Sequence, residues 1–124
     1  MEKTLIITGK GGSGKTSLAL EKCKNIKDDE LKYYGAMDIE SPFCFMDCNK
    51  NTKVIIIDNI KKEDLDKTLN RTSFKSLQIH NPMKEPFIIK PKFILVFDFE
   101  FTQDDLDVLG LSYSRRFKVL KTEI

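Results

Sequence analysis

The sequence has no long hydrophobic run, few cysteines and little excess charge. Apolar stretches such as Val54–Ile57 and Phe93–Phe97 are far too short to span a bilayer, and no signal-peptide pattern is present. Lysine and arginine total 21 against 19 acidic residues, which excludes a histone-like polycation. The three cysteines form no disulfide framework, and Cys44 and Cys48 lack a neighbouring ligand cluster, so we interpret both as buried thiols. We therefore expect a cytoplasmic protein without a membrane partner.

The 124 residues allow one compact domain, and 40% hydrophobic positions are enough for a core. No repeat, low-complexity segment or linker divides the chain, so we expect residues 1–124 to form a single domain. Strands are predicted at residues 4–8, 33–37, 54–58, 93–97 and 117–120, with a short extended piece at 43–47. Helices are predicted at residues 16–27, 63–70 and 102–109. This alternation indicates an α/β fold with a parallel sheet and with ligands at the carboxyl ends of the strands.

A glycine-rich segment follows the first predicted strand and fits the pattern G-x-x-x-x-G-K-[ST] in full. Its residues are Gly9, Lys10, Gly11, Gly12, Ser13, Gly14, Lys15 and Thr16. The glycines let successive N–H groups point at a phosphate, and the helix that follows adds its positive dipole end. Lys15 supplies a charge for the β- and γ-phosphates, and the Thr16 hydroxyl can bind Mg²⁺. A glycine-rich turn that binds nothing would not need a lysine and a hydroxyl at these offsets, so the segment predicts a nucleotide-binding P-loop.

A second candidate site lies where the buried strand Val54–Ile57 ends in Asp58. An aspartate at the carboxyl end of such a strand can hold the Mg²⁺ of a P-loop enzyme, usually through water. The alternative is an acid that caps a short helix at Lys61–Asp66. With a complete P-loop in the same chain, we interpret Asp58 as the metal-binding residue.

The segment Leu77–Phe93 adds a more discriminating pattern, because two short extended stretches flank a polar tip and lead into a buried strand. With the P-loop, it resembles the ATPase core of the AAA+ class, and within it the superfamily-3 helicases of viruses, phages and plasmids. The resemblance implies a P-loop NTPase core with a mainly parallel five-stranded sheet, flanking helices and a projecting β-hairpin. It also implies that His80 and Lys84, near the hairpin tip, grip the phosphates of single-stranded DNA. The alternative is an ordinary surface hairpin whose lysines are only solvated.

The same resemblance implies further site residues, and two of them depart from the family pattern. Asn59 stands where many related ATPases carry a catalytic glutamate, which leaves the water-activating residue open. Asp98 falls at the sensor-1 position, typically an asparagine, between the strand of the P-loop and the strand of Asp58. It would position the attacking water or sense the γ-phosphate. Arg115 or Arg116 would be an arginine finger that reaches the nucleotide of a neighbouring subunit, unless the pair is only a solvated strand entrance.

These patterns lead us to expect an ATP-binding and ATP-hydrolysing, Mg²⁺-dependent motor domain that forms a homo-oligomeric ring. It would act on single-stranded nucleic acid in replication of a virus, phage or mobile element. One alternative is a regulatory switch that binds ATP with little turnover, because Asn59 and Asp98 depart from strong hydrolytic patterns. Another is a small kinase or a ParA-like ATPase, because Lys10 also fits a signature-lysine P-loop. Such enzymes are usually longer, and a kinase needs an acceptor-binding lid for which the chain has little room.

Overall fold

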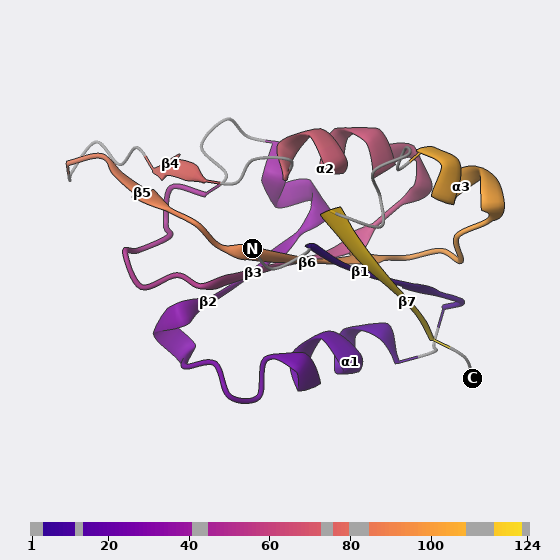
Figure 1. Ribbon diagram of the computed structural model, residues 1–124, viewed down its shortest axis with the longest axis horizontal. Coiled ribbons are helices and arrows are strands. Elements are labelled where there is room, and N and C mark those ends of the chain that lie inside the picture. Colours follow the sequence, from indigo (N-terminus) through magenta and orange to yellow (C-terminus); the bar gives the residue numbers. More distant parts are fainter. Residues whose placement is uncertain are drawn as a thin grey trace.

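The computed structural model describes residues 4–11, 14–40, 45–72, 76–79, 85–108 and 116–122. Its centre is a five-stranded sheet with the order β2-β3-β6-β1-β7, in which every pairing is parallel (Figure 1). The strands are β1 (Thr4–Gly9), β2 (Leu31–Gly35), β3 (Val54–Ile60), β6 (Lys92–Phe97) and β7 (Phe117–Thr122). The predicted α/β class with a parallel sheet is confirmed. So is the expected place of the Asp98 strand, since β6 lies between β1 and β3.

Helices cover both faces of this sheet. Helix α1 (Lys15–Lys22) packs on one face, while α2 (Leu65–Arg71) and α3 (Gln103–Val108) lie on the other (Figure 1). Short 3₁₀ segments occupy Asp28–Glu30, Ala36–Glu40 and Lys62–Asp64. None of the helices in these described ranges is long and apolar enough to cross a membrane.

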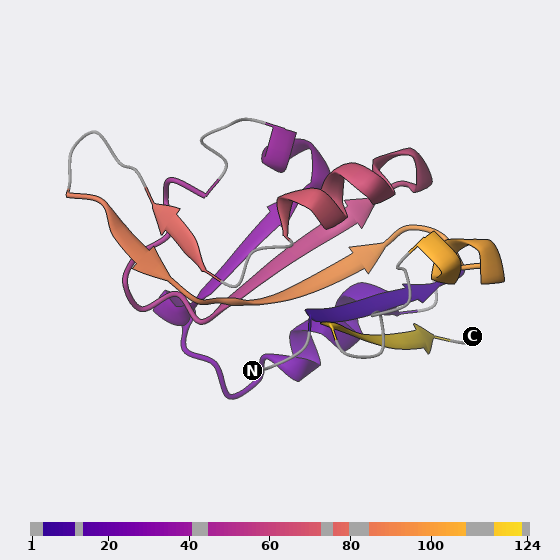
Figure 2. The same ribbon diagram turned by 45° about the horizontal axis from the view of Figure 1, so that its top comes forward.

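The predicted β-hairpin is also present, as a separate two-stranded antiparallel sheet of β4 (Leu77–Ile79) and β5 (Phe87–Ile89). It lies beyond the amino ends of the parallel strands and leads directly into β6 (Figure 2). Ile89 is buried at its base, where it pairs with Leu77, and Ile79 is buried next to the tip, where it pairs with Phe87, whereas Ile88 is exposed. The hairpin is therefore anchored on the core and projects from the end of the sheet opposite to the carboxyl edge.

Helix α1 is shorter than the sequence pattern predicts. It was expected to continue to Lys27, but it ends at Lys22 because the Cys23 amide donates to the Leu20 carbonyl, 3.0 Å away. A second tight turn follows, in which the Ile26 amide donates to the Cys23 carbonyl at 2.9 Å. The apolar spacing continues through these turns, so periodicity alone could not locate the helix end.

Two other expectations between β2 and β3 are wrong. The second strand was predicted at residues 33–37, but β2 spans Leu31–Gly35, and the Asp38 carboxylate accepts the Gly35 amide at 2.9 Å as the chain turns. The extended piece predicted at residues 43–47 is a turn over its described part, closed by the Cys48 amide on the Phe45 carbonyl at 3.1 Å. Local hydrogen bonds thus override the apolar pattern in both places.

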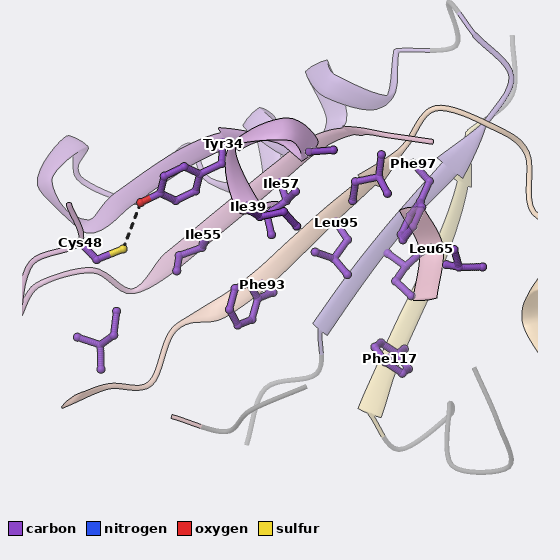
Figure 3. Close-up of a cluster of buried hydrophobic side chains, with 14 of the residues drawn as sticks. Tyr34, Ile39, Cys48, Ile55, Ile57, Leu65, Phe93, Leu95, Phe97 and Phe117 are labelled. Atoms are coloured by element: carbon purple, nitrogen blue, oxygen red, sulfur yellow. Dashed lines mark hydrogen bonds between the residues drawn. The ribbon is translucent and has the colours of Figure 1, made fainter. Parts of the chain in front are cut away.

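Alternate residues of each central strand enter two separate hydrophobic clusters. On the face of α2 and α3, the larger cluster takes Ile55 and Ile57 from β3 and Phe93, Leu95 and Phe97 from β6 (Figure 3). On the face of α1, the smaller cluster takes Leu5 and Ile7 of β1, Val54 and Ile56 of β3, and Ile94 and Val96 of β6, with Ala19 of α1. Because both faces are covered, these strands read as continuous apolar runs.

The described cysteines, Cys23 and Cys48, are buried free thiols, and burial raises the pKa of each. Cys48 lies at the edge of the larger cluster, where its sulfur is 3.4 Å from the Tyr34 hydroxyl (Figure 3). The prediction of a buried thiol is confirmed for Cys48, whereas Cys44 lies outside the described residues.

Candidate functional site

Strand alternation brings two carboxylates to the same edge of the sheet. On β3, the α1-facing series Val54 and Ile56 continues to Asp58. On β6, the α1-facing series Ile94 and Val96 continues to Asp98, directly after the strand. Because β3 and β6 are parallel neighbours, both acids lie at the carboxyl edge beside the first turn of α1.

The start of α1 completes this edge. Gly14, with φ 82° and ψ 22°, is the N-cap, a left-handed conformation that suits glycine, and its carbonyl accepts the Leu18 amide at 2.9 Å. Lys15 is the first helical residue and is only 7% exposed. Its ammonium group donates to the Lys10 carbonyl at 2.7 Å. The charge of Lys15 therefore lies against the backbone at the start of the glycine-rich segment.

Asp58 is buried and accepts three hydrogen bonds. The Thr16 hydroxyl donates to its Oδ2 at 3.0 Å, the Tyr33 hydroxyl donates to the same oxygen, and the Asn59 amide donates to Oδ1 at 2.7 Å. Within the described residues, these contacts join Asp58 to α1 and β2, and they leave no sign that it caps the 3₁₀ segment at Lys62–Asp64. A hydroxyl and a carboxylate in contact form an oxygen donor pair that fits a hard divalent cation such as Mg²⁺.

A β-bulge shapes the end of β3. The register with β6 shifts between Ile57 and Ile60, and Asn59 has φ 58°, which asparagine tolerates better than most residues. The Asn59 side chain is exposed, and its backbone amide supports Asp58. The bulge lets β3 continue to Ile60, whose carbonyl accepts the Asp98 amide at 2.7 Å. As a result, the Lys61 side chain lies beside Asp98.

Asp98 is paired rather than free. The Lys61 ammonium group donates to its Oδ2, and this contact holds the pKa of the Asp98 carboxyl below its usual range, with a smaller contribution from the charge of Lys15. The pKa of Lys61 is raised in turn, first by the hydrogen bond that its ammonium group donates to Asp98. At neutral pH the pair is therefore ionised, with one charge of each sign.

The segment after Asp98 is tied to the end of β1. The buried Thr8 hydroxyl donates to the Phe99 carbonyl at 2.6 Å and accepts the Phe101 amide at 2.8 Å. The Gly9 amide also donates to the Phe99 carbonyl, at 3.3 Å. This network fixes the chain beyond β6 against the beginning of the glycine-rich segment.

The start of α1 and the ends of β3 and β6 form a cavity of about 190 Å³ at the carboxyl edge of the sheet. It is lined by Gly14, Lys15, Thr16, Ser17, Asp58, Asn59, Val96 and Asp98. Six of these are predicted site residues, so the ends of β3 and β6 and the start of α1 bring part of the predicted site together. The arrangement offers a buried ammonium group and a helix N-terminus for an anion, beside an oxygen pair for a cation.

Other predicted residues are not brought to this cavity. Arg116 precedes β7 at the amino edge of the sheet, and its guanidinium lies 5.0 Å from the centroid of the Phe117 ring. Gly9, Lys10 and Gly11 are not among the residues that line the cavity. Gly9 ends β1, and the Lys10 carbonyl accepts the hydrogen bond from Lys15. The remaining predicted residues, Gly12, Ser13, His80, Lys84 and Arg115, lie outside the described residues.

Sequence reasoning missed Tyr33 and Lys61. Gly35 is the register partner of Asp58, and Tyr33 lies two residues earlier on the same side of β2. Its contact with Asp58 follows from this register, which the strand pattern alone does not give. Lys61 depends on the bulge at Asn59, for which the sequence offers only a turn-prone asparagine at the end of an apolar run.

Tyr33 should help to position Asp58 for a cation. Although Tyr33 is 49% exposed, desolvation of its hydroxyl and the hydrogen bond to the Asp58 carboxylate raise its pKa to about 12, so the hydroxyl remains a donor at neutral pH. Replacing Tyr33 by phenylalanine removes that donor. If the site binds a nucleotide with Mg²⁺, we expect the Mg²⁺ concentration needed for half-maximal nucleotide binding to rise about 10-fold, as for other supports of metal-binding groups. A Mg²⁺ titration at fixed nucleotide measures this. Unchanged Mg²⁺ dependence in the variant would exclude such a role.

Comparison with known proteins gives a fold but no family. No family model and no curated protein sequence matches the chain. Among solved structures, an A-form apo structure of the NrS-1 C-terminal region matches with a TM-score of 0.62 and 19% identity over 98% of this chain. A second A-form apo structure of that region matches with a TM-score of 0.59 and 18% identity, again over 98%. The chain spans 29% and 28% of those two chains, so it shares its fold with less than a third of each.

Proposed function

We propose that the chain is a P-loop ATPase domain that binds ATP with Mg²⁺, hydrolyses it, and acts as a helicase-like motor on single-stranded nucleic acid. One observation carries the nucleotide-binding part. The Thr16 hydroxyl is 3.0 Å from the Asp58 carboxylate, in a cavity that also contains the buried ammonium group of Lys15. A phosphate and a divalent cation are the ligand pair for which these groups are complementary.

The described residues have distinct parts in this proposal. Lys15 and the first amides of α1 bind the phosphates, and Thr16 with Asp58 holds Mg²⁺, which when bound neutralises phosphate charge. Tyr33 and the Asn59 amide fix the orientation of the Asp58 carboxylate. Arg116 lies at the opposite edge of the sheet in its own chain, so an arginine finger at this position would have to come from a neighbouring subunit of a ring.

The hairpin supports the motor part of the proposal. Strand β6 runs from the base of the hairpin to Asp98, so one strand connects the projecting element with the cavity (Figure 2). A change in the cavity on hydrolysis could thus move the hairpin, where His80 and Lys84 would grip nucleic-acid phosphates. The similarity in fold to the NrS-1 C-terminal region is compatible with this proposal.

A second candidate is a nucleotide-binding switch with little turnover. The residues that line the cavity include two carboxylates, Asp58 and Asp98, because Asn59 stands where many related ATPases carry a catalytic glutamate. Asp98 is paired with Lys61. Asp58 is occupied by three hydrogen-bond donors. No lining carboxylate of the cavity is thus a strong, unengaged base for the attacking water.

ATP hydrolysis with and without single-stranded DNA separates the two candidates. The motor predicts hydrolysis that DNA stimulates, and the double variant His80→Ala/Lys84→Ala should bind DNA more weakly. Loss of the single phosphate contact of Lys84 should also reduce the salt dependence by a slope of about 0.7. Lys22→Ala, an exposed lysine at the end of α1 on the other face of the sheet from the hairpin, is the control. Tight ATP binding without DNA-stimulated turnover would establish the switch instead, and absence of ATP binding would refute both.

A further inference from the structure

The ion pair between Lys61 and Asp98 borders the cavity, and Lys61 belongs to none of the motifs found in the sequence. Asp98 lines the cavity, and Lys61 follows the bulge at the end of β3. Their side chains are 37% and 54% exposed, so this is a surface pair, whose own contribution to stability is small. Its position beside Lys15 and Asp58 suggests a role in the charge of the site.

We infer that Lys61 is a charge-compensating residue that makes the cavity able to accept a polyphosphate despite the carboxylate of Asp98. This inference rests on the proposed function and assigns to that site a residue that the sequence pattern did not identify. Lys61 acts through Asp98, and it is therefore a positioning residue rather than a catalytic one.

The charges of the site explain why compensation is needed. Asp58 and Asp98 place two carboxylates on the cavity wall, whereas Lys15 is the one ammonium group among the lining residues. Without Lys61 the three groups sum to one negative charge, which repels a polyanion. With Lys61 bound to Asp98 the four groups sum to zero, and a divalent cation at Thr16 and Asp58 then makes the site positive.

The backbone holds this pair in place from both strands. The Asp98 amide donates to the Ile60 carbonyl at 2.7 Å, which fixes the ends of β3 and β6 against each other. The left-handed Asn59 and the shifted register set where Lys61 leaves the strand. Asp98 therefore stays ionised at the cavity, with Lys61 as its partner, before any ligand enters.

Nucleotide binding to charge variants of the pair tests the inference. Lys61→Gln exposes the Asp98 charge, and we expect about 5-fold weaker binding of an ATP analogue at low salt, shrinking as salt screens the repulsion. The loss should be larger for ATP than for ADP, because ATP carries one more phosphate. Lys61→Arg should keep wild-type affinity, and the double variant Lys61→Gln/Asp98→Asn should regain it.

Lys53→Gln is the matched control. Lys53 and Lys61 flank the two ends of β3, and Lys53 is likewise exposed, at 65%, and paired with an acid, Glu30, at 2.6 Å. The control has the same net charge as Lys61→Gln but lies at the amino edge, and it should bind ATP like the wild type. Equal affinity of Lys61→Gln and wild type, or a loss that Asp98→Asn does not restore, would overturn the inference while the proposed function stands. A wild-type protein that binds no ATP would overturn both.

Discussion

Replacing Lys15 by alanine is expected to lower ATP hydrolysis on the order of 100- to 1,000-fold, the usual cost of losing a preorganised electrostatic donor. Lys15 is 7% exposed, and its ammonium group is held 2.7 Å from the Lys10 carbonyl, beside the first turn of α1. It is thus fixed where the phosphates would enter. Alanine favours helix, so α1 should persist. Steady-state hydrolysis with Mg²⁺, together with circular dichroism, measures both effects.

Lys22→Ala provides the control for this prediction. Lys22 is the last residue of α1, is exposed, and carries the same charge on the same helix. Hydrolysis by this variant should equal that of the wild type. If Lys15→Ala retained most of the activity, or if both variants lost it equally, a phosphate-binding role for Lys15 would be excluded.

Replacing Phe97 by alanine is expected to lower the free energy of unfolding by about 3–5 kcal/mol, through lost burial and the cavity left behind. Phe97 is 0% exposed in the larger hydrophobic cluster, with its ring centroid 4.9 Å from that of Phe101 and 5.7 Å from that of Phe99 (Figure 3). Domains of this kind have a total stability of about 5–15 kcal/mol, so the loss is severe. Urea unfolding followed by circular dichroism gives the value.

Phe97→Leu separates the loss of volume from other effects. Leucine keeps most of the apolar volume, so this variant should lose less than about half as much stability as the alanine variant. Phe97 also precedes Asp98, and its packing fixes the end of β6 beside the cavity. A loss below about 1 kcal/mol for Phe97→Ala would mean that the cluster is not packed as described.

Much of the fold follows from sequence patterns that depend on burial. The parallel sheet was predictable because Val54–Ile57 and Phe93–Phe97 are apolar at every position, as strands covered on both faces must be. Strand alternation then places Asp58 and Asp98 on one face, and the glycine-rich segment predicts the helix that Lys15 begins. These inferences need only local period and composition.

The rest depends on tertiary geometry that no local pattern contains. The contact of Tyr33 with Asp58 requires the register of β2 on β3, and the pairing of Lys61 with Asp98 requires a bulge at Asn59. The early end of α1 after Lys22 depends on turn hydrogen bonds that compete with an unbroken apolar spacing. Such features arise when strands pair, so sequence predicts the site but not its supporting contacts.

Binding of Mn²⁺ with ATP, followed by nuclear magnetic resonance of the isotope-labelled chain, tests the central claim most directly. Mn²⁺ replaces Mg²⁺ at oxygen sites and broadens the signals of nearby nuclei. A metal-nucleotide site at Thr16 and Asp58 predicts broadening of the amides of Gly14, Lys15, Asn59 and Asp98 that requires ATP. The amides of Lys53 and Phe117, at the amino edge of the sheet, should stay sharp. Broadening centred elsewhere, or none when ATP and Mn²⁺ are both present, would contradict a nucleotide site in this cavity.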